Sequence, residues 1–152
     1  MDITELLDRK HIAPALQATD KPALLRELSQ RAARAIAIDP QAILEALQAR
    51  EALGSTGVGA GIAIPHARVA GLQQFFGYFV RLQRPIAFDA IDGRPVDLVV
   101  LLLSPDREDA EPLAALACIS RVLRNRDNAA KIRAAANERE IVDQLGLSET
   151  SS

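Results

Sequence analysis

Apolar residues in the first third of the chain recur at helical spacing, which predicts two amphipathic helices. The first runs from Lys21 to Ala37, and its apolar face consists of Leu24, Leu25, Leu28, Ala32, Ala35 and Ile36. Asp20 is placed to cap this helix, and Pro22 lies in its first turn, where proline is tolerated. The second helix is expected to open at Asp39-Pro40 and to end before Gly54, a residue that suits a left-handed C-terminal position. Its inward-facing residues are expected to be Ile43, Leu44 and Leu47.

The middle of the chain has the patterns expected of strands. Ile62 to Ile64 is predicted to be a short strand, and from Phe75 to Leu82 apolar residues alternate with a mixed second face. Val96 to Leu103 is apolar almost throughout, which is typical of a strand covered on both faces, so we expect it at the centre of the sheet. Between these two strands, Ile86-Ala87-Phe88 and the turn at Asp92-Gly93 indicate a smaller hairpin-like excursion.

The last third of the chain is predicted to be helical. The inward face of its first helix is expected to consist of Leu113, Leu116, Ala117, Ser120 and Leu123. A segment around Ile132 is expected to be capped by Asp127. Asn137 and Glu140 have the spacing of a capping box for a final helix that ends at Gly146.

Helices at both ends of a central group of strands predict an α/β fold. We expect a single three-layer domain, in which a mixed β-sheet of about five strands is flanked by helices on both faces. A chain of 152 residues has room for one such core. The domain is expected to span residues 1–147, and residues 148–152 are expected to be a frayed tail.

Composition excludes several classes of function. A net charge of −2 and an aromatic content of 3% provide neither a phosphate-binding face nor stacking platforms, so we expect no nucleic acid partner. The chain has no run of eighteen apolar residues, so we expect no membrane insertion. Its first residues carry acids where a signal peptide needs a basic start, which favours a cytoplasmic location.

The isolated cysteine and the first histidine are expected to be structural. Cys118 lies in an apolar helical stretch, where a free cysteine acts as a small core residue. His11 stands between Lys10 and Ile12 with no other candidate group around it. Two histidines and one cysteine, all far apart, lack the spacing of a His/Cys metal site, although carboxylate sites stay open.

Four of the eight glycines lie between Gly54 and Gly61. Glycines let successive backbone N–H groups turn toward one point, so this segment, Gly57 included, is a candidate anion nest to which Ser55 and Thr56 add hydroxyl donors. No Gly-Lys-Ser/Thr follows as in a Walker A loop, and the third glycine of the dinucleotide fingerprint is missing. By itself, such a segment fits a turn-rich connection equally well.

The second histidine follows this segment directly. His66 is expected at the end of the short apolar strand, where Pro65 restricts its position. No acidic residue occurs from Ala52 through Phe88, whereas the basic residues in or just before this stretch are Arg50, Arg68, Arg81 and Arg84. An imidazole can act as a nucleophile near neutral pH, and phosphoryl transfer depends mainly on positioning and charge neutralisation. An isolated histidine would favour a structural role, but these neighbours favour a phosphoryl acceptor.

A resemblance to a known family rests on two segments. Arg50-Glu51-Ala52-Leu53-Gly54-Ser55-Thr56, continuing through Ile64-Pro65-His66, resembles the active-site segment of IIA domains in the fructose/mannitol class of the bacterial phosphotransferase system. Pro85 to Leu98 resembles the nitrogen-related IIA proteins of that class. The resemblance covers about Ile3 to Leu145.

The resemblance implies a phosphotransferase in which His66 accepts a phosphoryl group, on Nε2, from a histidine-phosphorylated phosphocarrier protein. Phosphoenolpyruvate would be the source upstream, and no metal, nucleotide or other cofactor is implied. Arg50 would neutralise charge during transfer, and the phosphate-binding residues would be Ser55, Thr56, Gly57 and Arg68.

The nitrogen-related branch implies a regulatory protein that binds downstream target proteins according to the phosphorylation state of His66. The runner-up is the IIA component of a fructose/mannitol-type sugar transport system. A third hypothesis is a non-phosphorylated binding module, because many relatives carry a second histidine where this chain has Pro112.

Overall fold

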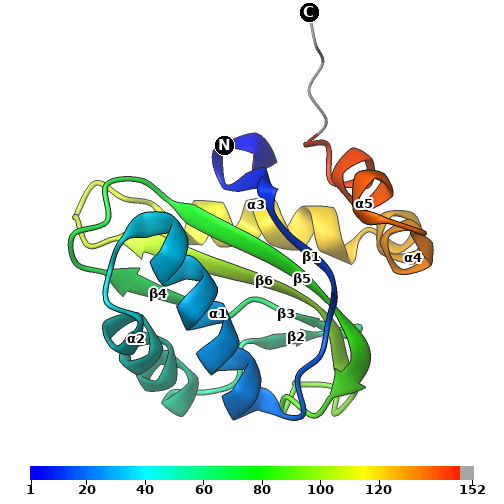
Figure 1. Cartoon of the computed structure of the whole chain (residues 1–152), viewed down its shortest axis with the longest axis horizontal. Helices are drawn as coiled ribbons and strands as arrows, with labels where there is room; N and C mark the ends of the chain where they lie inside the picture. The colour runs from blue at the N-terminus through cyan, green and yellow to red at the C-terminus, as the bar shows by residue number, and fades with distance from the viewer. Residues whose placement is uncertain (148–152) are drawn as a thin grey trace, which may run out of the picture.

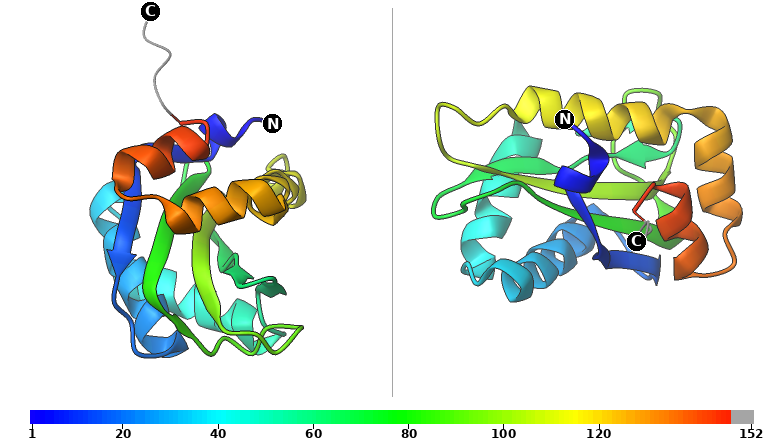
Figure 2. Two further views of the ribbon diagram at one scale, coloured as in Figure 1. Left: turned by 90° about the vertical axis from the view of Figure 1, so that its right-hand side faces the viewer. Right: turned by 90° about the horizontal axis from the view of Figure 1, so that it is seen from above.

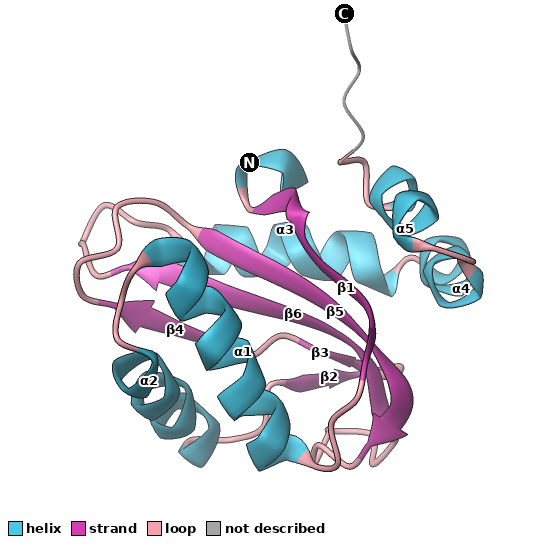
Figure 3. Ribbon diagram, viewed as in Figure 1, coloured by secondary structure: helices cyan, strands magenta, loops and turns pink. Residues whose placement is uncertain are grey.

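Two long antiparallel strands form the centre of the sheet in the computed structural model, which describes residues 1–147. The mixed sheet has six strands, and its order is β1-β5-β6-β3-β2 with β4 also paired to β6. The strands are β1 (Leu7–Leu16), β2 (Gly57–Gly59), β3 (Ile62–Ala63), β4 (His66–Val69), β5 (Phe76–Ile86) and β6 (Val96–Pro105). Pairing with β6 is parallel for β3 and β4, and β1 is parallel to β5 (Figure 3). The mixed sheet and the central place of β6 confirm the prediction.

Helices cover both faces of this sheet. They are η1 (Ile3–Glu5), α1 (Lys21–Ile36), α2 (Pro40–Ala52), α3 (Pro112–Arg124), α4 (Arg126–Ala134) and α5 (Glu138–Gln144). Figures 1 and 2 show α1 and α2 on one side of the sheet and α3 on the other. The predicted three-layer α/β architecture is therefore confirmed. Within residues 1–147, no helix combines the length and apolar character that a membrane crossing needs, and the expected tail at 148–152 lies outside the described residues.

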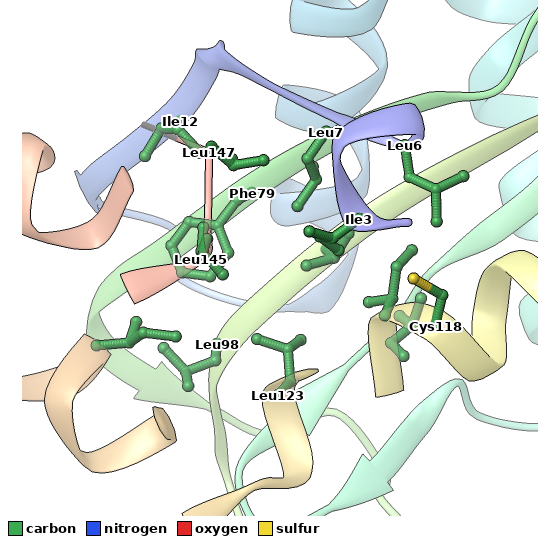
Figure 4. Close-up of a cluster of buried hydrophobic side chains, with 14 of the residues drawn as sticks. Ile3, Leu6, Leu7, Ile12, Phe79, Leu98, Cys118, Leu123, Leu145 and Leu147 are labelled. Carbon is green, nitrogen blue, oxygen red and sulfur yellow. The ribbon is translucent and has the colours of Figure 1, made fainter. Parts of the chain in front are cut away.

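The alternation of side chains along β6 divides the core into two clusters. Val99, Leu101 and Leu103 pack on the side of α1 and α2. Leu98, Val100 and Leu102 face the opposite side, where α3, α4, α5 and the N-terminal segment cover them. Figure 4 shows this second cluster, including Cys118, which is a buried free thiol as expected. Successive residues of a strand point to opposite faces, so a strand that is apolar throughout requires both layers of helices.

The two N-terminal helices follow the prediction closely. Asp20 accepts a hydrogen bond from the backbone N–H of Ala23, and Asp39 caps α2 by accepting from Gln41 N–H. Along the predicted inward face of α1, Leu24, Leu25, Leu28 and Ala32 are buried, whereas Ala35 is exposed. Local capping chemistry therefore determines where these helices begin.

Strand β1 was not predicted, and β5, which was expected to end at Leu82, is longer than expected. β1 carries a charged run from Asp8 to Lys10 and contains Pro14, which an edge strand tolerates because one side of its backbone has no strand partner. β5 continues past Leu82 to Ile86, which pairs with Val96. The expected excursion is therefore the loop between β5 and β6, in which Gly93 has a φ of 72°.

The predicted inward face of α3 is correct at Leu123 but wrong over the first turns of the helix. Its buried residues are Ala115, Cys118, Ile119 and Leu123. Leu113 is 80% exposed, and Leu116 is only partly buried. α3 has apolar residues on more than one face, so helical periodicity alone could not decide which face meets the sheet. In addition, the cap of α4 is Asn125, which accepts from Asn128 N–H, and not Asp127.

The close approach of β1 to β5 gives a test of the fold. A Cβ on Gly77 would overlap the carbonyl oxygen of Leu6, so Gly77→Ala should lower the free energy of unfolding by about 2 kcal/mol. Gly71→Ala is the control, because Gly71 has open space but a φ of 86°, and its cost should be about 1 kcal/mol. Urea unfolding of both variants measures these losses. Equal losses would contradict the steric explanation at Gly77.

Candidate active site around His66

His66 is the first residue of β4, and not the last residue of the preceding strand as expected. The register with β6 is the same on both sides of the interruption, since Ile62 pairs with Leu98 and His66 with Leu102. Pro65 has no N–H, but its carbonyl oxygen accepts from Leu102 N–H at 2.9 Å. β3 and β4 therefore form one line along β6 that breaks at Ile64-Pro65, and His66 follows this break.

Two hydrogen bonds determine the protonation state of the His66 ring. Nδ1 lies 2.7 Å from the carbonyl oxygen of Ile64, and the Nε atom of Arg50 lies 3.2 Å from Nε2. A carbonyl can only accept and a guanidinium can only donate. His66 is therefore neutral, with its proton on Nδ1 and a lone pair on Nε2.

Arg50 reaches His66 from the last turn of α2. Its Nη1 atom donates to the carbonyl oxygen of Gly54 at 2.9 Å, while its Nε atom donates to His66. A cation in the last turn also interacts favourably with the negative end of the helix dipole. Arg50 thus connects the end of α2, the start of the glycine-rich segment and the imidazole, and Figure 1 shows α2 beside β4.

The pKa of His66 is lowered from its ordinary value of 6.5, mainly because the half-buried ring is desolvated. The hydrogen bond to Ile64 raises the pKa in part, the charge of Arg50 lowers it, and the charge of Glu51 raises it. The sum favours the neutral imidazole at neutral pH, which is the form that can attack phosphorus.

A groove of about 400 Å³ lies over His66 and brings together two of the four basic residues noted in the sequence, whereas Arg81 and Arg84 do not line it. Arg50 and Arg68 both line it, and so does Pro112 at the start of α3. Arg68 donates from Nη1 to the carbonyl oxygen of Arg107 at 3.0 Å. Leu53 and Leu113, which are 85% and 80% exposed, contribute apolar surface to the same groove. The groove therefore combines two guanidinium groups with exposed apolar side chains.

The two predicted hydroxyl donors have other hydrogen-bond partners within residues 1–147. Ser55 Oγ donates to the carbonyl oxygen of Phe88 at 2.7 Å and accepts from Gly57 N–H at 3.0 Å. Thr56 Oγ1 donates to Glu51 Oε1. Both residues lie close to Arg50 in the chain, but neither hydroxyl contacts His66 in this structure.

The glycine-rich segment folds as a tight hairpin between β2 and β3. Its turn is Ala60-Gly61, with φ values of 58° and 79°, as in the turns that suit two-residue hairpins. Gly57 lies in β2, where an added Cβ would be 2.8 Å from the Cβ of Ala90. Packing therefore favours glycine at Gly57, and both packing and the positive φ favour it at Gly61, whereas alanine occupies the first position of the turn.

Glu51 is a polar residue of the site that sequence reasoning did not assign. Its side chain is 7% exposed and forms an ion pair of 2.7 Å with Lys21 Nζ. It also accepts from the backbone N–H of Thr56 at 3.2 Å and from the Thr56 hydroxyl. A buried carboxylate needs such partners. The only signal in the sequence was the acidic residue directly after Arg50, at the edge of a stretch without acids.

His11, the other histidine, packs against aromatic rings. The ring of His11 lies 4.9 Å from that of Phe76 and 5.8 Å from that of Tyr78, measured between centroids, which fits the structural role expected for it. Among residues 1–147, no three or more His, Cys, Asp or Glu side chains gather in a way that could hold a metal ion.

Fold and site together define an α/β domain with a histidine at an arginine-lined groove, and comparison with known families assigns this domain. The family model for the phosphoenolpyruvate-dependent sugar phosphotransferase system, EIIA 2, matches residues 5–146. The chain belongs to this family, and a domain of this family has a role in phosphoryl transfer.

Within the family, the chain is similar to nitrogen regulatory proteins. One from Bradyrhizobium diazoefficiens is 46% identical over 147 residues, which cover 97% of this chain and 96% of that protein. One from Escherichia coli K12 is 35% identical over 142 residues, which cover 93% of this chain and 87% of that protein. The crystal structure of nitrogen regulatory protein IIA-Ntr from Neisseria meningitidis superposes with a TM-score of 0.87 at 34% identity, covering 94% of this chain and 98% of that one. These relatives confirm the assignment to the nitrogen-related branch.

The pKa of His66 tests the arrangement of its charged neighbours. We expect a pKa below 6.5 that rises in Arg50→Ala, because the guanidinium disfavours the imidazolium ion, and falls in Glu51→Gln, because the carboxylate favours it. NMR titration of the imidazole signals gives these values, and His11 serves as an internal reference that should not move. A His66 pKa that is the same in all three proteins would contradict the geometry.

Proposed function

We propose that this chain is a regulatory phosphoprotein of the nitrogen-related phosphotransferase system, in which His66 accepts a phosphoryl group from a histidine-phosphorylated phosphocarrier protein. The observation that carries the proposal is the 3.2 Å contact between Arg50 Nε and His66 Nε2 in an exposed groove, which indicates that Nε2 carries a lone pair. The proposed place of action is the cytoplasm.

The transfer step follows from the protonation state of the ring. His66 Nε2 supplies the electron pair for the new N–P bond, while the N–P bond of the phosphocarrier breaks and its histidine nitrogen takes that pair. The positive charge that develops on the His66 ring is shared with Nδ1–H, whose hydrogen bond to the Ile64 carbonyl then strengthens. The backbone of the β3–β4 break therefore both orients the ring and stabilises the product.

Arginine side chains neutralise the phosphoryl oxygens in this proposal. Arg50 releases Nε2 as the phosphoryl group arrives and turns its guanidinium toward the oxygens, a short movement from its present 3.2 Å contact. Arg68, in the same groove, offers a second guanidinium. Ser55, Thr56 and the backbone of Gly57 are proposed to hydrogen-bond the phosphate. For the two hydroxyls this requires a rotation away from Phe88 and Glu51.

The rim of the groove is the proposed contact surface for partner proteins. Leu53 and Leu113 flank the site from α2 and α3 and are largely exposed. Exposed apolar side chains around a polar centre are typical of protein interfaces. Phosphorylation would add negative charge inside this rim, so the phosphocarrier and the downstream target proteins can discriminate between the two forms of the chain.

Phosphorylation in a reconstituted system is the direct test. Incubation with phosphoenolpyruvate, the first enzyme of the system and its phosphocarrier should add one phosphoryl group that is labile in acid and stable in base. His66→Ala should take up no label and keep the circular dichroism spectrum of the parent chain, because the half-buried ring is replaced by a smaller side chain at the start of an existing strand. Labelling of this variant at the parental level would refute the site, and an unlabelled parent chain would favour a non-phosphorylated binding module.

Position 112 should tune the reaction, because Pro112 lines the groove over His66. An imidazole there could donate a hydrogen bond to the phosphoryl group, which is worth roughly 0.5–1.5 kcal/mol. Pro112→His should therefore change the rate of phosphorylation or the lifetime of phosphohistidine by several fold, as followed by loss of label with time.

Pro112→Ala is the matched control for this change, because it removes the proline from the first turn of α3 without adding an imidazole. Identical kinetics for the two variants would mean that the imidazole has no role at this position.

A further inference from the structure

A second pocket lies where the turn of the β2–β3 hairpin meets the corner between α3 and α4, a corner that Figure 2 shows clearly. Its volume is about 280 Å³, and four arginines line it: Arg94, Arg124, Arg126 and Arg133. Ile62 and Leu123 supply apolar surface between them. None of these residues lines the groove over His66.

One of the four arginines, Arg133, already has hydrogen-bond partners within the fold. Arg133 binds both carboxylate oxygens of Asp97, with contacts of 2.9 Å, and its Nη2 atom donates to the carbonyl oxygen of Ala60 at 2.8 Å. It therefore holds the hairpin turn against the α4 side of the pocket. This geometry fixes one wall of the pocket.

The charges of the remaining arginines are not balanced locally. Within residues 1–147, the guanidinium groups of Arg124 and Arg126 have no hydrogen bond and no ion pair. The charge of Arg94 acts on Asp92, whose carboxylate also accepts from Ala60 N–H at 2.9 Å. Four arginines and no carboxylate thus line the pocket, and Asp97 and Asp92 pair with or act on two of these arginines, in a chain whose net charge is −2. The excess of positive charge is therefore local to the pocket, because the chain as a whole is slightly negative.

We propose that this pocket binds a small anion that carries two or more phosphate or carboxylate groups. The planar guanidinium fork matches both groups, and several such forks around one pocket suit a ligand with several charges. The apolar surface of Ile62 and Leu123 would contact the uncharged part of the ligand. The pocket's volume of about 280 Å³ is slightly below the roughly 300–1,000 Å³ of sites for drug-sized ligands, so the ligand must be small.

The pocket lies at the turn of the β2–β3 hairpin, and β3 of this hairpin leads to His66. The turn at Ala60 forms one end of the hairpin, and at the other end Ile64 N–H donates to the Thr56 carbonyl at 3.0 Å. The carbonyl oxygen of Ile64 in turn holds His66 Nδ1. The proposal does not depend on the function of His66, but a bound anion should be detectable in the backbone signals of the hairpin.

The test is an NMR titration of the whole chain with two probes, inorganic tripolyphosphate and citrate, at 0.15 M salt. We expect at least one probe to bind with saturation and to shift the amide signals of Ala60, Ile62 and Ala130. The stronger of the two probes identifies phosphate or carboxylate as the preferred group. The variant Arg124→Gln/Arg126→Gln should raise the Kd by roughly tenfold or more, the loss expected for one charge-assisted hydrogen bond.

Two control variants separate a specific site from general attraction. Arg121→Gln/Arg139→Gln removes the same charge from exposed positions that do not line the pocket, and its Kd should stay within roughly twofold of the parent value. Arg50→Ala removes a guanidinium from the groove over His66 and should leave the shifts at Ala60 and Ala130 unchanged. Equal weakening by the two double variants, loss of binding in Arg50→Ala, or the absence of saturable binding by either probe would each overturn the proposal.

Discussion

The hydrogen bond from Arg50 Nε to His66 Nε2 joins the end of α2 to the start of β4, and the arrangement of the site depends on it. The bond requires a neutral ring that carries its proton on Nδ1. Nδ1–H donates to the carbonyl oxygen of Ile64. The carbonyl oxygens of Gly61 and Pro65 accept from β6, so the carbonyl of Ile64, which lies between them, points away from β6 and is available to a side chain. The backbone just before His66 thus determines which imidazole nitrogen faces the groove.

The charges around this bond fall into two groups. Arg50 and Arg68 line the groove, whereas Glu51 does not line it and is paired with Lys21 and Thr56. The buried carboxylate holds the start of the glycine-rich segment to α2 and α1, and it offsets part of the effect of Arg50 on the pKa of His66. A positive groove near a compensated carboxylate favours an incoming phosphoryl group without a large surplus of buried charge.

The hairpin between β2 and β3 links two regions rich in arginine. One end follows α2 and contacts Glu51 through Thr56, and the turn at the other end is held by Arg133. Three positions in this short segment have glycine-like requirements, at Gly57, Ala60 and Gly61, for reasons of packing and turn geometry. Turn geometry and packing therefore account for part of the concentration of glycines without assigning each one to an anion.

The sequence by itself determined the layers of the fold and indicated the candidate residues of the site. The apolar run of β6 required cover on both faces, Asp20 and Asp39 marked the starts of α1 and α2, and His66 with Arg50 stood out in a stretch without acids. These features are local, because capping, periodicity and residue type act within a few positions. The tertiary structure decided which face of α3 is buried, that the charged segment Leu7–Leu16 forms an edge strand, and that Glu51 holds the Thr56 hydroxyl. It also decided the tautomer of His66. The buried face of α3, the edge strand and the tautomer of His66 depend on groups far apart in the chain, since a helix with several apolar faces, an edge strand and a neutral imidazole all take their final state from what packs against them. The contact between Glu51 and Thr56 spans only five positions, but it depends on how the chain turns after the end of α2.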